Sequence, residues 1–222
     1  MITPSVLARV SLFADLEENY LRRLAEELRP RRYRRGESVF VTGDPGTSLC
    51  VVNAGRIKLA LTSNEGREVI LDVLGPGEVF GELALLDGEP RSADAIAVEP
   101  TELLLLQRDE FVRFLRAQPD AAISLLGVLS RRIRRDTQLV QDAAFLDVPA
   151  RLARTILRLA ERDAHGVLRT PRLTQTDIAG AAGTTRETLN KWLGFFANQG
   201  LIEWVDSQVV VLDADRLRRR IY

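Results

Sequence analysis

The longest unbroken helical pattern of the chain runs from Pro119 to Phe145, and it constrains the fold more than any other feature. No proline follows Pro119 in this stretch, and Gly127 is its only glycine. One helix of about 25 residues is therefore expected, and at 1.5 Å per residue it would be about 38 Å long. A small domain cannot hide a helix of that length.

Apolar residues repeat every seven positions along this helix, with a second position three residues after the first. The first positions are Leu126, Ile133 and Val140, and the second are Leu129, Asp136 and Ala143. This spacing is typical of a two-stranded coiled coil, so it predicts a homodimer. The alternative is a helix packed on its own domain, because the repeat is short.

Asp136 is the polar exception in this seam. It would bring one carboxylate from each subunit near the dimer axis, where an unpaired buried charge is costly. Three interpretations stay open at this point: the residue sets the helix register, it is solvated at a flared helix end, or it contacts a ligand.

Short apolar strands separated by glycine turns fill most of residues 33–106. The expected strands are Ser38–Val41, Leu49–Asn53, Arg56–Leu61, Glu68–Val73 and Thr101–Leu106. Such dense spacing of strands and turns indicates a β-sandwich or β-roll. Helical spacing precedes this region at residues 6–28 and returns after Arg108. The fold class is therefore α+β.

Local signals after residue 147 predict a helix-turn-helix followed by a hairpin. Thr174 and Asp177 have the spacing of a capping box at the start of one helix. Thr185 can cap a second helix that ends near Asn198, before Gly200. The hairpin of residues 201–212 would form a wing. The chain thus divides into a β-roll effector domain (1–118), a dimerisation helix (119–146) and a winged helix-turn-helix domain (147–222).

The second helix of this motif has one apolar and one polar face. Its inward residues are Leu189, Leu193 and Phe196, and its outward residues are Arg186, Glu187, Asn190 and Lys191. The outward set lies in the first half of the helix, the half that enters the major groove in such motifs. Arginine can donate two hydrogen bonds to guanine, and glutamate can accept from cytosine. The alternative is a solvated face with pairs four residues apart.

Composition excludes several other classes of protein. Cys50 and His165 are the only cysteine and histidine, so a disulfide framework, a multi-histidine metal centre, a haem sensor and an iron–sulfur cluster are not expected. We expect Cys50 to be a buried strand thiol. No nucleophile–base set indicates an enzyme, and no signal or membrane-spanning stretch argues against a cytoplasmic protein. Residues 147–222 hold 12 basic and 9 acidic residues, which mildly favours a nucleic-acid partner.

Over nearly its whole length the chain resembles the cyclic-AMP receptor protein family of bacterial transcription regulators. Its most specific segments are Gly81-Glu82-Leu83-Ala84 and Pro90-Arg91-Ser92-Ala93, which resemble the family's phosphate-binding cassette. The resemblance implies cyclic AMP as ligand, with Leu83 in its site. Arg91 and Ser92 would bind the cyclic phosphate, Glu82 would accept from the ribose 2′-hydroxyl, and Gly81 would allow close backbone approach. The alternative is a Glu82–Arg91 pair in an empty roll.

The resemblance also assigns residues of the long helix. Aligning the segment 145–148 with the family's hinge places Asp136 and Thr137 where family members carry a polar pair facing adenine, and it places Arg132 on a family-like arginine. Asp136 departs from the family pattern. Cyclic di-GMP, or regulation without any ligand, therefore stay as alternatives.

In the DNA-reading segment, Thr185-Arg186-Glu187-Thr188 resembles the family, whereas Lys191 stands where an arginine is usual. Lysine cannot make the bidentate fork, so specificity at that base step should be looser. The resemblance implies a twofold-symmetric operator with TGTGA-like half-sites, and RNA polymerase as a further partner. The residues expected to contact DNA are Thr174, Thr176, Thr185, Arg186, Glu187, Asn190 and Lys191. A cyclic-nucleotide module controlling some other activity would need a different effector domain, for which residues 150–222 leave no room.

Overall fold

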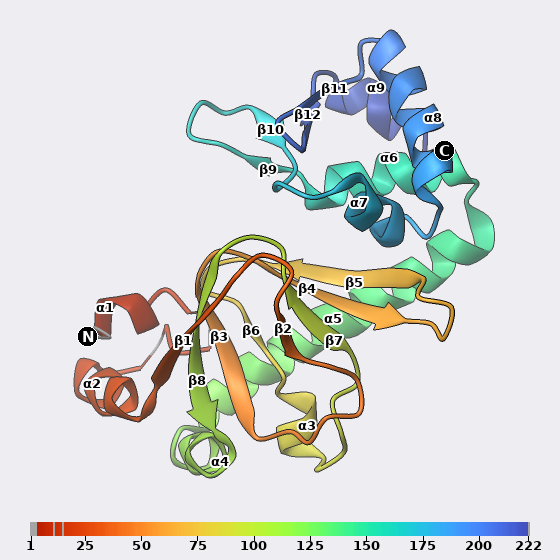
Figure 1. Cartoon of the computed structure of the whole chain (residues 1–222). Coiled ribbons are helices and arrows are strands. Elements are labelled where there is room, and N and C mark those ends of the chain that lie inside the picture. Colours follow the sequence, from red (N-terminus) through yellow and green to blue (C-terminus); the bar gives the residue numbers. More distant parts are fainter. Residues whose placement is uncertain (1–3, 11, 15, 222) are drawn as a thin grey trace. The chain divides into compact units, whose positions relative to one another are not determined.

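The computed structural model describes residues 4–10, 12–14 and 16–221 (Figure 1). By compactness they form two units. The first comprises the described residues up to Leu61 together with Val73–Arg135, and the second comprises Thr62–Asp72 and the residues from Asp136 onward. The expected domain boundaries after residues 118 and 146 stay a prediction, because compactness divides the chain within the long helix α5 (Pro119–Phe145) rather than at its ends.

Two four-stranded sheets confirm the predicted β-roll. One has the order β1 (Arg29–Tyr33), β8 (Thr101–Gln107), β3 (Ser48–Ala54), β6 (Val79–Phe80). The other has the order β2 (Ser38–Phe40), β7 (Asp94–Ala97), β4 (Ile57–Thr62), β5 (Glu68–Leu74). The five expected strands are present, and no end shifts by more than one residue. Strand β1 escaped prediction because its first four residues are exposed and most are arginines.

The interior of the roll is filled by apolar and aromatic side chains from both sheets. Its buried members are Tyr33, Cys50, Val52, Ile57, Leu74, Phe80, Ala95, Ala97 and Leu103. Cys50 is the buried strand thiol that the sequence predicts, and burial raises the pKa of this thiol to about 12. Phe40 packs against this cluster from β2.

The N-terminal helical spacing is interrupted in the structure. Instead of one helix over residues 6–28, the chain forms α1 (Pro4–Leu7) and α2 (Glu18–Glu27). Between them the backbone turns tightly, with Val10 N–H donating to Leu7 O and Phe13 N–H to Val10 O. The expected apolar face is still buried, because these turns pack on α4 (Arg108–Ala117), where the Phe13 and Phe114 rings meet edge to face.

Helix α5 confirms the long helix and spans 27 residues. One of its faces is covered by its own unit, since Ala121 and Leu125 are buried in the core. The seam face is uncovered in the single chain. Leu126, Ile133 and Val140 are 61%, 65% and 69% exposed. The first heptad positions therefore form an apolar row that is more than half exposed in the single chain.

The second unit contains the predicted helix-turn-helix and wing. Its helices are α6 (Val148–Leu159), α7 (Gln175–Ala181), α8 (Arg186–Asn198) and α9 (Ala214–Arg218). Its sheet has the order β11 (Ile202–Val205), β12 (Gln208–Val211), β10 (Leu168–Arg169), β9 (Glu161–Arg162). The predicted inward residues of α8 are all buried. Asp206 and Ser207 both have positive φ, the backbone that a two-residue hairpin turn requires.

None of the helices described is long and apolar enough to cross a bilayer. No cluster of three or more potential metal ligands occurs within residues 4–10, 12–14 and 16–221.

Candidate functional site

The cassette begins with a sharp turn at Gly81, directly after β6. Gly81 has a φ of +81°, a left-handed backbone that glycine adopts without strain. A Cβ at this position would lie 2.4 Å from Nη1 of Arg91. Glycine is therefore needed both for the turn and for the close approach of the guanidinium. Helix α3 (Leu83–Leu86) follows immediately.

Arg91 is turned inward and is only 4% exposed. Its Nη1 donates to Gly81 O at 2.6 Å, and its Nη2 donates to Ser48 O at 2.7 Å. Its Nε is buried and has no hydrogen-bond partner among the described residues. Burial lowers the pKa of this guanidinium, because desolvation disfavours its charged form.

Glu82 is the most buried charged residue of the cassette, at 1% exposure. Its Oε1 accepts a hydrogen bond from Nη1 of Arg132 at 2.5 Å, and Arg132 also donates to Val79 O. Its Oε2 is buried and has no hydrogen-bond partner in the part of the chain that the structure describes. Glu82 and Arg91 thus bond to other groups, and each keeps one polar atom unused.

The structure brings together some of the predicted ligand residues and separates others. Gly81, Glu82, Arg91 and Arg132 form one connected cluster, which we call the cradle. Leu83 and Ser92, next to it in the chain, have exposed side chains. Asp136 and Thr137 are exposed on α5 one turn beyond Arg132, where the helix belongs to the second unit.

Sequence reasoning missed several groups that hold the cradle. The carbonyls of Ser48 and Val79 accept from the two arginines, and no side-chain pattern could reveal a backbone acceptor. The Phe40 ring also lies under Arg91, with its centroid 4.2 Å from the guanidinium carbon. The apolar pattern of β2 predicts a core residue at position 40 and gives no sign of the cation.

The DNA-reading candidates lie on the two helices of the second unit. Thr174 caps α7 through a complete capping box with Asp177, and Thr185 Oγ1 caps α8 by accepting from Thr188 N–H at 3.2 Å. All seven predicted contact residues have exposed side chains. Arg186 Nε donates to Gln175 Oε1 at 3.2 Å, which links the starts of the two helices.

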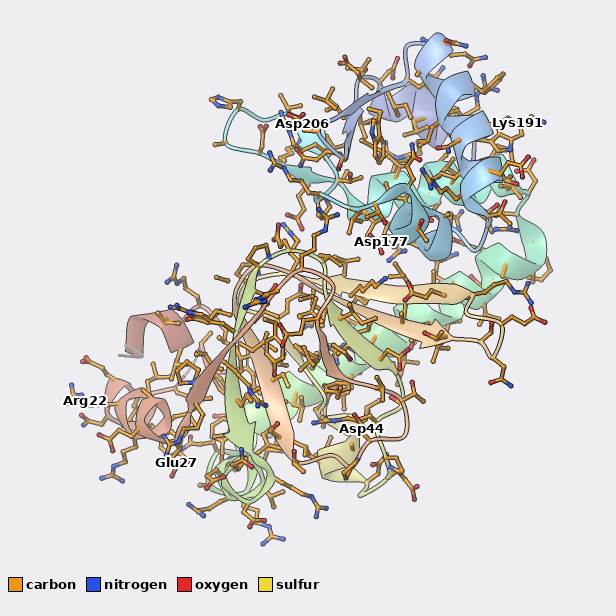
Figure 2. All side chains as sticks on the ribbon, viewed as in Figure 1. Arg22, Glu27, Asp44, Asp177, Lys191 and Asp206 are labelled. Carbon is orange, nitrogen blue, oxygen red and sulfur yellow. The ribbon has the colours of Figure 1, made fainter. Side chains whose placement is uncertain are left out.

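Lys191 is labelled on the outer side of α8 in Figure 2. Its Nζ lies 5.9 Å from the Trp192 ring centroid. The first half of α8 therefore presents cationic, acidic and amide groups to solvent, which are the donors and acceptors that base edges recognise.

Arg151 of α6 is a further residue that sequence reasoning missed. Its guanidinium donates to three backbone carbonyls: Leu146 at 3.0 Å, Ala182 at 3.2 Å and Gly183 at 3.2 Å. The last two carbonyls belong to the turn between α7 and α8. Arg151 therefore ties this turn to the segment that joins α5 to α6.

Comparison with known proteins agrees with this geometry. Residues 30–118 match the model of the cyclic nucleotide-binding domain, and residues 150–220 match that of the Crp-like helix-turn-helix domain. The chain is 36% identical over 219 residues to a CRP-like cAMP-activated global transcriptional regulator of Mycobacterium tuberculosis, covering 97% of this chain and 98% of that protein. It is 35% identical to the cyclic AMP receptor protein of Thermus thermophilus, covering 90% of this chain and 88% of that protein.

A solved structure extends the comparison to the fold. The crystal structure of the Thermus thermophilus catabolite activator protein is 33% identical and covers 95% of this chain and 98% of its own, with a TM-score of 0.55.

Proposed function

The chain belongs to the cyclic-AMP receptor protein family and is a DNA-binding transcription regulator, and from this premise we propose that it acts as a homodimer switched by cyclic AMP. The proposal places it in the cytoplasm, on a twofold-symmetric operator with TGTGA-like half-sites, and with RNA polymerase as a further partner. It assigns regulation rather than catalysis to the chain.

The unused buried atoms of the cradle carry the ligand proposal. Glu82 Oε2 is an acceptor and Arg91 Nε is a donor, and both are buried without a recorded partner. Leaving such groups unpaired costs free energy, so each needs an explanation. A cyclic nucleotide would supply a phosphate anion for the Nε–H and a ribose hydroxyl for the carboxylate.

Arg132 gives this ligand a route to the long helix. The carboxylate that would accept the ribose hydroxyl already holds Arg132 of α5 through its other oxygen. A hydroxyl that donates to Oε2 draws electron density away from Oε1. It thereby alters the ion pair between Glu82 and Arg132, and so acts on the helix. The ligand can favour a DNA-binding state only by its difference in affinity for the two states.

The exposed row of α5 supports the homodimer. Three aliphatic side chains repeat at intervals of seven residues and are more than half exposed in the single chain. A second copy of the same helix would cover them in a two-stranded coiled coil. Asp136 lies on the same heptad pattern, and we propose that it faces either the partner or the adenine amino group.

Calorimetry and operator binding test the ligand. We expect cyclic AMP to bind the full-length protein and to tighten its binding to a TGTGA-based palindromic duplex. Cyclic GMP and cyclic di-GMP are tested in the same way as alternative effectors. Arg91→Ala should leave basal DNA binding intact and remove the response, whereas Arg108→Ala removes an exposed arginine outside the cradle and should keep the response. Maximal operator affinity without nucleotide, together with no binding of cyclic AMP, would establish the ligand-independent alternative.

A seam variant tests the dimer. Ile133→Lys would bring an ammonium from each subunit to the seam without a partner, and self-association should weaken about 100-fold, or about 3 kcal/mol. Gln141→Lys adds the same charge at an exposed position outside the heptad seam and should leave association unchanged. Sedimentation velocity over a dilution series measures both. A fully dimeric Ile133→Lys protein at low concentration contradicts the coiled-coil assignment.

A further inference from the structure

Phe40 forms the floor beneath the guanidinium of Arg91. It is the last residue of β2, and its ring centroid lies 4.2 Å from the guanidinium carbon. A second ring, Phe80, lies 5.8 Å from Phe40 in a tilted arrangement and supports it from the roll interior. The cation therefore rests on an aromatic face that is itself packed in place.

The segment after Phe40 fixes the main chain of the same arginine. Gly43 N–H donates to Arg91 O at 2.9 Å, and Arg91 N–H donates to Asp44 O at 2.8 Å. Asp44 marks this loop in Figure 2. One stretch of five residues thus holds both the backbone and the side chain of Arg91, although it is about fifty positions away in the sequence.

The charge of Arg91 is poorly compensated by its hydrogen bonds. Its two acceptors, Gly81 O and Ser48 O, are neutral carbonyls, and the residue is almost fully buried. A cation–π contact is stronger when the cation is desolvated than at an exposed site. The carboxylates of Glu82 and Asp44 also favour the charged form of this guanidinium, and the ring of Phe40 adds to what keeps the charge at this buried position.

We propose that Phe40 is a positioning residue for the anion site, holding Arg91 by a cation–π contact so that its Nε–H stays free for the ligand. The ring contributes negative potential without taking up a hydrogen-bond donor, unlike a carboxylate at the same place. This inference rests on the proposed function of the cradle as a phosphate site. The alternative is that Phe40 has only a packing role and fills volume in the roll.

Fluorinated phenylalanines separate the two roles, because fluorine withdraws electron density from the ring face while changing its size little. We would introduce mono-, di- and trifluorophenylalanine at position 40 of the full-length protein and measure cyclic-AMP binding by calorimetry. The dissociation constant should rise stepwise, by about tenfold over the series. The same series at Phe80, whose ring is not recorded over a cation, is the control and should change affinity less than about twofold. Equal effects at the two positions, or a flat series at Phe40, overturn the proposal.

A measurement without ligand keeps this test separate from the identity of the ligand. The Nε–H proton of Arg91, identified by its loss in Arg91→Lys, should be shielded by the ring and protected from exchange with water. Phe40→Leu keeps an apolar side chain, and it should shift this resonance downfield and speed its exchange. If the exchange rate of this proton is unchanged in Phe40→Leu, the positioning role is wrong. If exchange quickens but the parent binds no cyclic nucleotide, the positioning role stands and only the proposed ligand fails.

Discussion

Glu82 and Arg91 of the cradle are almost fully buried and bond to groups 10, 43 and 50 positions away in the sequence. The residues of α8 that face solvent are instead fixed by Thr185, one position before the helix begins. The cradle is therefore a product of the tertiary fold, whereas the reading helix is a product of local sequence. We therefore expect the cradle to be sensitive to small changes around it, and the reading face to tolerate substitutions that keep the helix.

The two regions also differ in how fully their polar groups are satisfied. The cap of α7 is closed in both directions, with Thr174 and Asp177 each serving the other. Among the described residues, the cradle retains two buried polar atoms without hydrogen-bond partners. Because unpaired buried groups are costly, we expect the free cradle to lower stability, whereas the two members of the α7 capping box satisfy each other.

A pair of glycine substitutions tests this comparison with the largest expected effect. Gly81 and Gly183 both have positive φ, so alanine at either should cost about 1–2 kcal/mol of unfolding free energy. Only Gly81→Ala also meets Arg91, and we expect it to weaken cyclic-AMP binding about 100-fold by displacing the guanidinium. At Gly183 an added Cβ meets nothing within 4 Å, so ligand binding should survive. Calorimetry measures the cyclic-AMP affinity of both variants, and thermal unfolding measures their stability. Equal cyclic-AMP affinities of the two variants would contradict the comparison.

Substitutions on the reading face should change selectivity and leave the cradle untouched. Arg186→Ala and Glu187→Ala should each cost about 2 kcal/mol at the cognate base, or about thirtyfold. Asn198→Ala, at the exposed far end of the same helix, is the control. A binding-site selection in which both variants keep the parental sequence preference would remove these residues from the DNA interface.

Removing a cap tests whether the reading helix depends on local signals. Thr185→Ala deletes the acceptor for Thr188 N–H, and we expect a loss of about 1 kcal/mol in unfolding free energy. Thr185→Ser should restore it, and Thr184→Ala should have a smaller effect, because Thr184 is not the cap. Chemical denaturation gives the values. An unchanged midpoint in Thr185→Ala would show that tertiary packing alone fixes the helix.

Asp136 should give the smallest effect. If the proposed dimer brings two Asp136 carboxylates together, Asp136→Asn removes their repulsion and keeps an acceptor. We expect about threefold tighter operator binding without nucleotide, and a weaker response to cyclic AMP, since the repulsion is solvent-screened. Asp120→Asn removes the same charge from the first turn of α5 and should change neither. Fluorescence anisotropy with labelled operator measures both variants, and a parental response in Asp136→Asn contradicts a switching role.

The parts of the molecule that sequence predicts well are those with local causes. Helix α8 begins and ends where the Thr185 cap and the following glycine indicate, and the heptad repeat of α5 predicts its exposed row. The cassette motif located Glu82 and Arg91 but not what they bond to. Backbone acceptors such as Ser48 O, and the ring of Phe40, come close only after the roll closes.

Two sequence patterns were also misleading about local structure. The spacing of residues 6–28 fits one helix, but packing of Phe13 on Phe114 favours tight turns in its middle. Strand β1 pairs with β8 although its first four residues are exposed, since backbone hydrogen bonds do not require apolar side chains. Neither outcome follows from periodicity, because both depend on a neighbour distant in the sequence.

The chain's single thiol can serve as a chemical probe for the opening of the roll. Cys50 is buried in β3, and its pKa of about 12 leaves only about one thiol in ten thousand ionised at pH 8 even if reagent could reach it. Alkylation of the native protein must then wait for the sheet around Phe80 to separate. The rate of labelling would report how often the roll opens locally. A bound nucleotide should slow this labelling, and the degree of slowing would measure ligand affinity without any dye or tag.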